Sequence, residues 1–149
     1  MTTLHRAFEG VVRIGIDTSP FIYLIEAHAD YYPLVAPLFE RFDSGEIGAI
    51  TSSITVAEVT VLPLRLGRSD LSQQYLELLL NSRNLDVLAI DIPVAQVAAE
   101  LRARFRIRLP DALQLAVAIV AGCDAFLTND VALKQVTDIR VITLADLLS

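Results

Sequence analysis

The chain alternates between short, continuous apolar runs and longer segments whose apolar residues recur at helical spacing. Short runs bounded by turn residues are typical of strands buried on both faces, whereas helical spacing is typical of helices that pack on one side. The runs predict strands at residues 11–17, 47–51, 85–90, 125–128 and 140–143.

The segments between these strands predict helices. Proline suits the first helical position, so Pro20 and Pro110 mark helix starts, and Ser19 is a suitable N-cap. The segment 31–42 is expected to break near Pro33 or Pro37, because proline removes an intrahelical hydrogen bond. The predicted helices span 20–29, 31–42, 54–66 (with a kink or end at Pro63), 71–81, 93–105 and 111–121, followed by short helices at 131–136 and 144–148.

This alternation of strands and helices predicts an α/β fold, a three-layer α/β/α sandwich around a mostly parallel sheet. The 149 residues fit a single domain, 1–149, in which residues 1 to about 10 form an irregular lead-in. The helix at 111–121 is apolar nearly all round, so it is expected to be central and buried.

Composition adds two constraints. The apolar fraction of 54% exceeds the roughly 45–50% of typical soluble domains, which fits either a subunit or partner interface or a core of fully buried parallel strands. The net charge of −6 argues against a simple electrostatic binder of nucleic acid. It does not argue against an enzyme whose acidic groups are neutralised by a metal ion.

Membrane and disulfide chemistry are not expected. No apolar run reaches the roughly 18 residues of a membrane span, and charged residues precede the first apolar run, unlike a signal peptide. The single cysteine, Cys123, excludes an internal disulfide and fits a reducing cytoplasm. With two histidines besides, His5 and His28, the chain offers little support for a zinc site or for a Ser-His-Asp device.

Four carboxylates stand out by their positions. Asp17 follows the first predicted strand, Glu58 lies in an apolar helical stretch, Asp111 lies in the first turn of the apolar helix and Asp130 follows the fourth strand. Ligands of open α/β sheets bind at the carboxyl ends of strands. Carboxylates gathered there would repel one another, and Mg²⁺ or Mn²⁺, which accept oxygen ligands, would relieve that repulsion.

Each acid also has a purely structural interpretation. Asp17 and Asp130 fit helix N-caps, and the positive end of a helix would stabilise Asp111. Glu58 fits the polar edge of an amphipathic helix. Spacing along the sequence does not prove that the four meet in space, so both interpretations stand at this point.

The four acids lie in four short segments: Asp-Thr-Ser at 17–19, Thr-Val-Ala-Glu-Val at 55–59, Pro-Asp-Ala-Leu-Gln-Leu-Ala at 110–116 and Leu-Thr-Asn-Asp at 127–130. In this order the segments resemble the motifs of PIN domains, and most closely those of the small toxin ribonucleases of the VapC type. The resemblance runs from about residue 14 to the C-terminus. Two features depart from the family: residues 131–133 are Val-Ala-Leu where a charged residue and then an aromatic are common, and the lead-in is long.

This resemblance implies a Rossmann-like sheet of order 3-2-1-4-5 and an acidic pocket that binds Mg²⁺ or Mn²⁺. It implies endonucleolytic cleavage of RNA phosphodiester bonds. By motif, the catalytic and metal-binding acids would be Asp17, Glu58, Asp111 and Asp130, and Thr128 would be a hydroxyl behind these ligands.

Arginines provide a candidate contact for RNA. Arg104, Arg106 and Arg108 shortly precede Asp111, and positive charge beside an acidic site would position phosphates. As surface residues they fit simple solvation equally well.

The resemblance also implies protein partners, namely a cognate antitoxin and a second copy of the chain. A candidate apolar surface lies at Tyr31, Tyr32, Leu34, Val35, Leu38 and Phe39, and the alternative is that this segment only covers the sheet.

Other functions remain to be weighed. A receiver domain would need an acidic pair where Asp17 stands alone, and a dehalogenase-like phosphatase would need a second aspartate where Ser19 stands. Gly15 alone does not make a nucleotide-binding turn. The remaining alternatives on the same fold are a solitary RNA-processing nuclease and a non-catalytic RNA- or protein-binding module.

Overall fold

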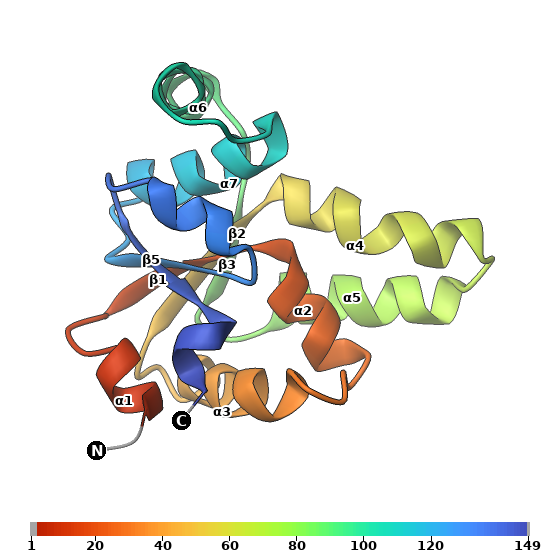
Figure 1. Cartoon of the computed structure of the whole chain (residues 1–149). Helices are drawn as coiled ribbons and strands as arrows, with labels where there is room; N and C mark the ends of the chain where they lie inside the picture. Colours follow the sequence, from red (N-terminus) through yellow and green to blue (C-terminus); the bar gives the residue numbers. More distant parts are fainter. Residues whose placement is uncertain (1–2, 149) are drawn as a thin grey trace.

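The computed structural model describes residues 3–148, and a five-stranded parallel sheet forms its centre (Figure 1). The strand order is β3-β2-β1-β4-β5, which confirms the predicted order. In the middle strand, Gly15 lies opposite Ile50 on one side and Phe126 on the other. The strands are β1 (Arg13–Ile16), β2 (Gly48–Ser52), β3 (Leu85–Leu88), β4 (Ala125–Thr128) and β5 (Arg140–Thr143).

Helices cover both faces of the sheet, which confirms the three-layer α/β/α arrangement (Figure 1). One layer is α6 and α7, and the other contains α1, α2, α3 and α5. The hairpin of α4 and α5 projects to one side of the body. The helices are α1 (Thr3–Ala7), α2 (Thr18–Ile25), α3 (Tyr32–Asp43), α4 (Ser53–Arg65), α5 (Ser69–Asn81), α6 (Ile92–Arg104) and α7 (Leu109–Val120), with the 3-10 helices η1 (Val131–Gln135) and η2 (Leu144–Leu147).

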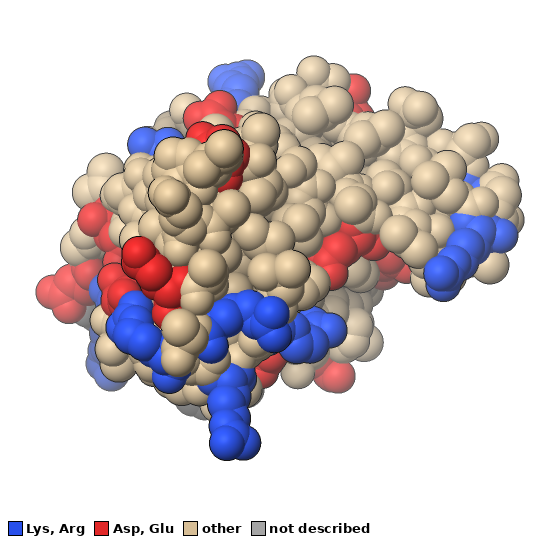
Figure 2. Space-filling view, turned by 90° about the horizontal axis from the view of Figure 1, so that it is seen from above, with Lys and Arg blue, Asp and Glu red and all other residues tan. Residues whose placement is uncertain are grey.

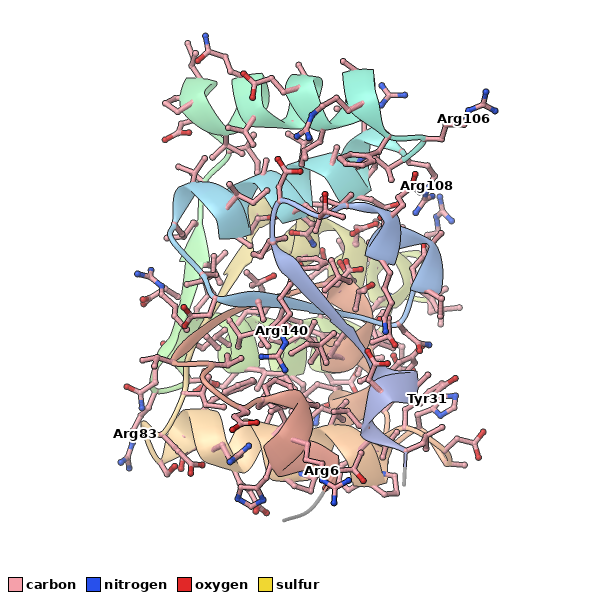
Figure 3. All side chains as sticks on the ribbon, turned by 60° about the vertical axis from the view of Figure 1, so that its left-hand side comes forward. Arg6, Tyr31, Arg83, Arg106, Arg108 and Arg140 are labelled. Atoms are coloured by element: carbon pink, nitrogen blue, oxygen red, sulfur yellow. The ribbon has the colours of Figure 1, made fainter. Side chains whose placement is uncertain are left out.

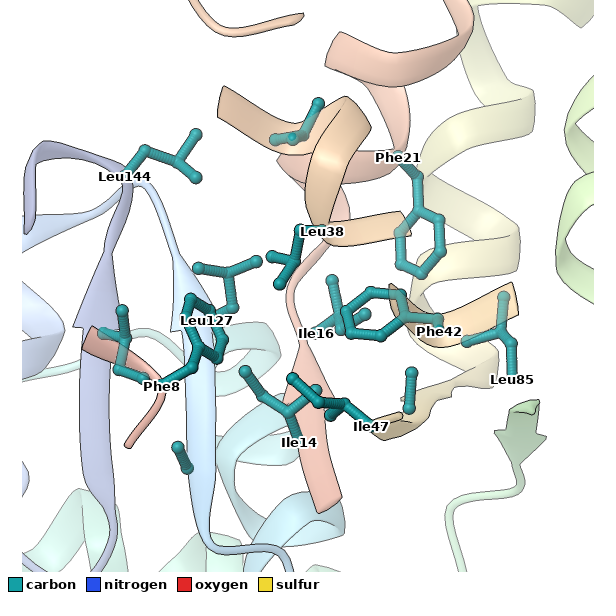
Figure 4. Packing of buried hydrophobic residues seen from close by; sticks show 14 of the residues in the cluster. Phe8, Ile14, Ile16, Phe21, Leu38, Phe42, Ile47, Leu85, Leu127 and Leu144 are labelled. Atoms are coloured by element: carbon teal, nitrogen blue, oxygen red, sulfur yellow. The ribbon is translucent and has the colours of Figure 1, made fainter. Parts of the chain in front are cut away.

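The core lies in two apolar clusters, one on each side of the sheet. In the larger cluster, Ile14 and Ile16 of β1 pack with Phe21 of α2 and with Leu38 and Phe42 of α3 (Figure 4). Because buried side chains of β1 and α2 belong to the same cluster, the packing fixes the position of α2 relative to β1. The turn that joins them is therefore held in place as well.

The lead-in differs from the prediction. Residues 1 to about 10 were expected to be irregular, but Thr3–Ala7 forms a short helix, and residues 1–2 lie outside the described part. Leu4 and Ala7 pack against the larger core cluster, which gives this helix an apolar face to bury.

The start of α2 also differs. The helix begins at Thr18 and its N-cap is Asp17, whose side chain accepts a hydrogen bond from the Thr18 amide, so the prediction of Ser19 as N-cap was wrong. Pro20 occupies the third helical position, where the backbone N–H would also lack an intrahelical partner.

Proline interrupts neither α3 nor α4. The helix α3 continues through Pro37, because Val35 and Leu38 are fully buried on either side of it. Because Val35 and Leu38 belong to the core, they do not contribute to the apolar surface considered above, and Tyr32, at 41% exposure, is the one largely exposed large apolar residue of that segment. The helix α4 likewise continues past Pro63 to Arg65.

Among residues 3–148, no helix combines the length and the apolar character that crossing a bilayer requires.

Candidate active site

Asp17 lies where β1 ends, and two hydrogen bonds hold its carboxylate. Its Oδ1 accepts from the backbone N–H of Thr18 at 2.8 Å, and its Oδ2 accepts from the hydroxyl of Thr128 at 2.7 Å. Thr128 reaches it because β1 and β4 are parallel neighbours in which Ile16 lies opposite Leu127. Asp17 is therefore both a helix cap and a carboxylate fixed at the sheet's carboxyl edge.

The surroundings of Asp17 disfavour its charge. Burial raises the pKa of this carboxyl above its ordinary value, and the nearby carboxylates of Asp111 and Glu58 raise it further. The hydrogen bonds from Thr128 and Thr18 act in the opposite direction without cancelling the rise. A cation beside Asp17 would reverse this imbalance.

The other three acids reach the same place from three different elements. Glu58 projects from α4 and accepts a hydrogen bond on Oε1 from the Thr18 hydroxyl at 2.7 Å. Asp111 lies in the first turn of α7 and pairs with Arg108, its Oδ2 lying 3.3 Å from Nε. Asp130 caps η1 by accepting from the Ala132 N–H at 3.0 Å.

These acids surround one open cavity of about 410 Å³ at the carboxyl edge of the sheet. All four predicted acids and Thr128 line it, although Asp17 and Asp130 also cap helices. For Asp17 and Asp130 the capping interpretation is therefore confirmed, and capping does not keep their side chains out of the cavity. The lining residues are Asp17, Thr18, Ser19, Ile22, Glu58, Arg108, Asp111, Thr128, Asn129 and Asp130.

The three candidate arginines lie in different places. Arg108 lines the cavity, and its hydrogen bond to Asp111, together with the charges of Glu58 and Asp130, raises the pKa of the guanidinium above its ordinary value. Arg104 instead pairs with Asp138, away from the lining residues. Arg106 points outward at the same edge of the molecule as Arg108 (Figure 3).

The donor set fits a hard divalent cation in kind, because four carboxylates supply only oxygen ligands. Burial first, and then the charges of Asp111 and Glu58, raise the pKa of Asp17, and a bound cation would act in the opposite direction. Within residues 3–148, no three His, Cys, Asp or Glu side chains stand close enough together to enclose an ion as they are placed here.

A buried polar network behind the cavity was missed by sequence reasoning. Gln114, only 3% exposed, donates from Nε2 to the hydroxyls of Thr55 at 2.7 Å and Thr18 at 3.3 Å. Its Oε1 accepts from the hydroxyl of Ser52. The Thr51 hydroxyl, 2.8 Å from that of Thr55, donates to the carbonyl of Ile16. The network therefore joins β1, β2, α4 and α7 directly behind the acids.

One sequence signal could have found this network. Gln114 is the one uncharged polar residue in the apolar helix α7, three positions after Asp111 and thus on the same face. A buried amide in such a helix must find hydrogen-bond partners, and the hydroxyls of Ser52 and Thr55 supply two of them.

Replacing Gln114 with Leu is expected to lower the free energy of unfolding by about 2–3 kcal/mol, because buried hydroxyls would lose their partners. Urea denaturation measures the change. The control is Gln73→Leu, at an exposed position of α5, which should change stability little. Equal stabilities of the two variants would contradict the importance of the network.

Comparisons with known proteins agree with this geometry. The profile of the PIN domain matches residues 14–139. Among solved structures, a chain of the VapBC2 complex from Rickettsia felis, bound to a DNA fragment from their promoter, is 19% identical with a TM-score of 0.67. It covers 88% of this chain and 98% of its own.

Two further structures are similar. VapC20 from Mycobacterium tuberculosis, described as a toxin that cleaves the sarcin-ricin loop, is 18% identical with a TM-score of 0.66 over 85% of this chain and 98% of its own. A chain of FitAcB from Neisseria gonorrhoeae is 21% identical with a TM-score of 0.62, and the match covers 89% of this chain and 98% of that one. No curated protein matches the sequence. These structural likenesses support the fold, and the profile covers most of the sequence, so the chain belongs to the PIN domain family.

Proposed function

We propose that this protein is an endoribonuclease dependent on Mg²⁺ or Mn²⁺, the toxin of a type II toxin–antitoxin pair. The observation that carries the proposal is the meeting of four carboxylates from separate elements in one cavity of a PIN domain. The similar VapC20 structure is described as a toxin that cleaves the sarcin-ricin loop, which supports RNA as the substrate class.

In this proposal Asp17 and Asp111 would hold the cation, and Asp130 would complete the acidic set. When bound, the ion would supply positive charge that activates water and offsets the charge developing on the phosphate. Glu58 orients the attacking water, because the Thr18 hydroxyl fixes its carboxylate at the cavity wall. Arg108 contacts a phosphate oxygen of the RNA at the rim, where its side chain is 76% exposed.

A cleavage assay with a metal titration tests this proposal. Purified protein should cut single-stranded RNA in Mg²⁺ or Mn²⁺, stop in EDTA and resume when the ion is restored. Metal binding without cleavage would favour a non-catalytic RNA- or protein-binding module. Absence of a small neighbouring gene for a DNA-binding protein would favour a solitary RNA-processing nuclease.

The arginine rim gives a separate prediction about RNA binding. The double variant Arg106→Gln, Arg108→Gln should weaken affinity for single-stranded RNA. It should also reduce the magnitude of the slope of log affinity against log salt concentration by about 1.4, because each lost phosphate contact removes roughly 0.7. Arg6 and Arg83 lie away from this rim (Figure 3), so the double variant Arg6→Gln, Arg83→Gln is a charge-matched control. An equal slope for wild type and the rim variant would contradict the rim contact.

We propose an antitoxin and a second copy of the chain as partners. The surface over α4 is mostly free of charged side chains (Figure 2), and large apolar residues are exposed there and on α5. Such exposed apolar area is typical of interaction sites. Light scattering of the purified chain tests the homodimer, and co-purification with the product of a neighbouring gene tests the antitoxin. The exposed apolar residues are Val61, Leu62 and Leu64 of α4, Leu66 directly after it and Leu80 of α5.

A further inference from the structure

Three aromatic rings pack together in and beside the loop that follows α2. Tyr23 lies 4.7 Å from Tyr31 and 4.9 Å from His28 between ring centroids, and His28 stacks on Tyr31 at 4.8 Å with an interplanar angle of 28°. We call Tyr23, His28 and Tyr31 the aromatic cluster. Each of the three side chains is only partly buried. The cluster therefore presents ring surface to solvent.

The backbone around the cluster is well fixed. The Nδ1 of His28 accepts from the backbone N–H groups of Asp30 at 3.1 Å and Tyr31 at 3.2 Å. The backbone N–H of His28 in turn donates to the backbone carbonyl of Tyr23. The rings are thus held in position before any ligand arrives, which lowers the conformational cost of binding to them.

A direct hydrogen bond connects the cluster to the acidic cavity. The side-chain amide of Asn129, a residue that lines the cavity, donates to the Tyr23 hydroxyl at 2.8 Å. Asn129 lies between Thr128 and Asp130 in the sequence, and both of these neighbours line the cavity. Through Asn129 the cluster is therefore connected to the wall of the site.

The cavity therefore has two different flanks. Arg108 forms one flank, and the aromatic cluster lies beyond Asn129 on the other. Figure 3 shows Arg106, Arg108 and Tyr31 along the same side of the molecule, with the two arginines toward one end of that side and Tyr31 toward the other. A positively charged track combined with aromatic rings is the general means of binding single-stranded nucleic acid, since phosphates contact the cations and bases stack on the rings.

We infer that the aromatic cluster is a stacking subsite for an unpaired base of single-stranded RNA whose backbone crosses the acidic cavity from Arg108. This inference rests on the proposed ribonuclease function. Stacking on aromatic side chains is how proteins hold the splayed bases of RNA loops and single strands. The subsite would place the nucleotide beside the cleaved bond and thereby set which unpaired regions are cut.

The test measures binding of a fluorescent oligouridine by anisotropy in EDTA, so that no cleavage occurs. Tyr31→Leu removes the ring but keeps apolar volume, and it should weaken binding about five- to hundredfold. Tyr31→Phe keeps the ring and should bind like the wild type. Tyr31 is the residue to change because its side chain makes no cap hydrogen bond, whereas the His28 side chain holds the loop.

Two further readouts separate stacking from a merely structural effect. The salt dependence of binding should be the same for Tyr31→Leu and wild type, because no phosphate contact is lost. An oligomer with abasic sites in place of the bases should bind both proteins equally. In cleavage assays with metal, Tyr31→Leu should raise KM and leave kcat nearly unchanged.

The failures are distinguishable. If wild type cuts RNA but Tyr31→Leu binds oligouridine as tightly as Tyr31→Phe, the stacking subsite is refuted and the nuclease proposal stands. An equal loss of affinity for the abasic oligomer would also refute stacking, because no base is involved there. If wild type neither binds nor cuts single-stranded RNA, both proposals fall.

Discussion

Replacing Asp17 with Asn should reduce metal-dependent RNA cleavage by about a thousandfold, comparable to removing one essential electrostatic group from an active site. Asn keeps the shape of the side chain and can still accept the hydrogen bond from the Thr18 amide that caps α2. It lacks the charge that would hold a cation. Unchanged cleavage by a correctly folded Asp17→Asn protein would refute the proposed role of the acidic cavity.

The same substitution should not destabilise the metal-free protein at neutral pH. The pKa of Asp17 is raised in the folded state, first by burial, so the folded protein binds this proton more tightly than the unfolded chain does. The contribution of Asp17 to stability is fully present below the ordinary value of 3.8 and is lost as pH rises through the raised folded pKa. The stability of Asp17→Asn relative to wild type should therefore increase over that interval and then level off.

Asp124→Asn is the matched control. Asp124 lies outside the cavity, and hydrogen bonds from the backbone N–H groups of Val12 and Arg13 lower its pKa. Its contribution to stability is present above the ordinary value and is lost as pH falls, which is the opposite sign. Urea denaturation in EDTA at a series of pH values measures both variants. Asp124→Asn should keep cleavage activity and be less stable than wild type at neutral pH.

Replacing Gly15 with Ala should lower the free energy of unfolding by about 3 kcal/mol, because it overpacks a tight contact. A Cβ at Gly15 would lie 2.5 Å from the Cβ of Ala118 in α7 and 3.2 Å from a ring carbon of Phe126. Gly15 lies two residues before Asp17, and α7 carries Asp111. The variant should therefore also cut RNA more slowly, since a shift of α7 that relieves the contact would change the position of Asp111 relative to Asp17.

Two comparisons make this prediction specific. Gly48→Ala, on the neighbouring strand β2, places its Cβ no closer than 3.8 Å to another atom and should be nearly neutral. Adding Ala118→Gly to Gly15→Ala should restore much of the lost stability, because it removes the atom that clashes. Urea denaturation of the single and double variants measures this coupling. A Gly15→Ala protein as stable as Gly48→Ala would contradict the packing.

The sheet and the position of the acids were accessible from the sequence for one physical reason. Strands buried on both faces read as continuous apolar runs, and the carboxyl ends of parallel strands share one edge of the sheet. Asp17 follows its strand directly and Asp130 follows its strand after one residue, so their approach follows from topology. Asp111 and Glu58 required the additional assumption that α7 and α4 begin at that edge, which the resemblance to PIN domains supplied.

Features that depend on contacts between distant residues were not accessible in this way. The bond between Gln114 and Thr18 joins positions 96 residues apart, and the contact between Gly15 and Ala118 depends on how closely α7 approaches the sheet. An apolar pattern also does not say what covers it. The residues from Tyr31 to Phe39 could equally have faced a partner. In the structure Val35 and Leu38 lie in the core, whereas Tyr32 stays exposed.

The buried network behind the acids has a definite direction. The hydrogen of Thr51 goes to the Ile16 carbonyl, so the hydrogen of Thr55 must point to Thr51. The two amide hydrogens of Gln114 are then taken by Thr55 and Thr18, and the remaining hydrogen of Thr18 points to Glu58. Each hydroxyl and amide hydrogen in this chain of bonds therefore has one acceptor.

If the Gln114 amide turned over, its oxygen would face Thr18 and Thr55, and their hydrogens would rotate toward it. Glu58 would lose its only donor in the network, and Ser52 would face hydrogens where it now meets an oxygen. The orientation of one amide group in the interior thus decides whether a carboxylate at the cavity wall stays held or swings free.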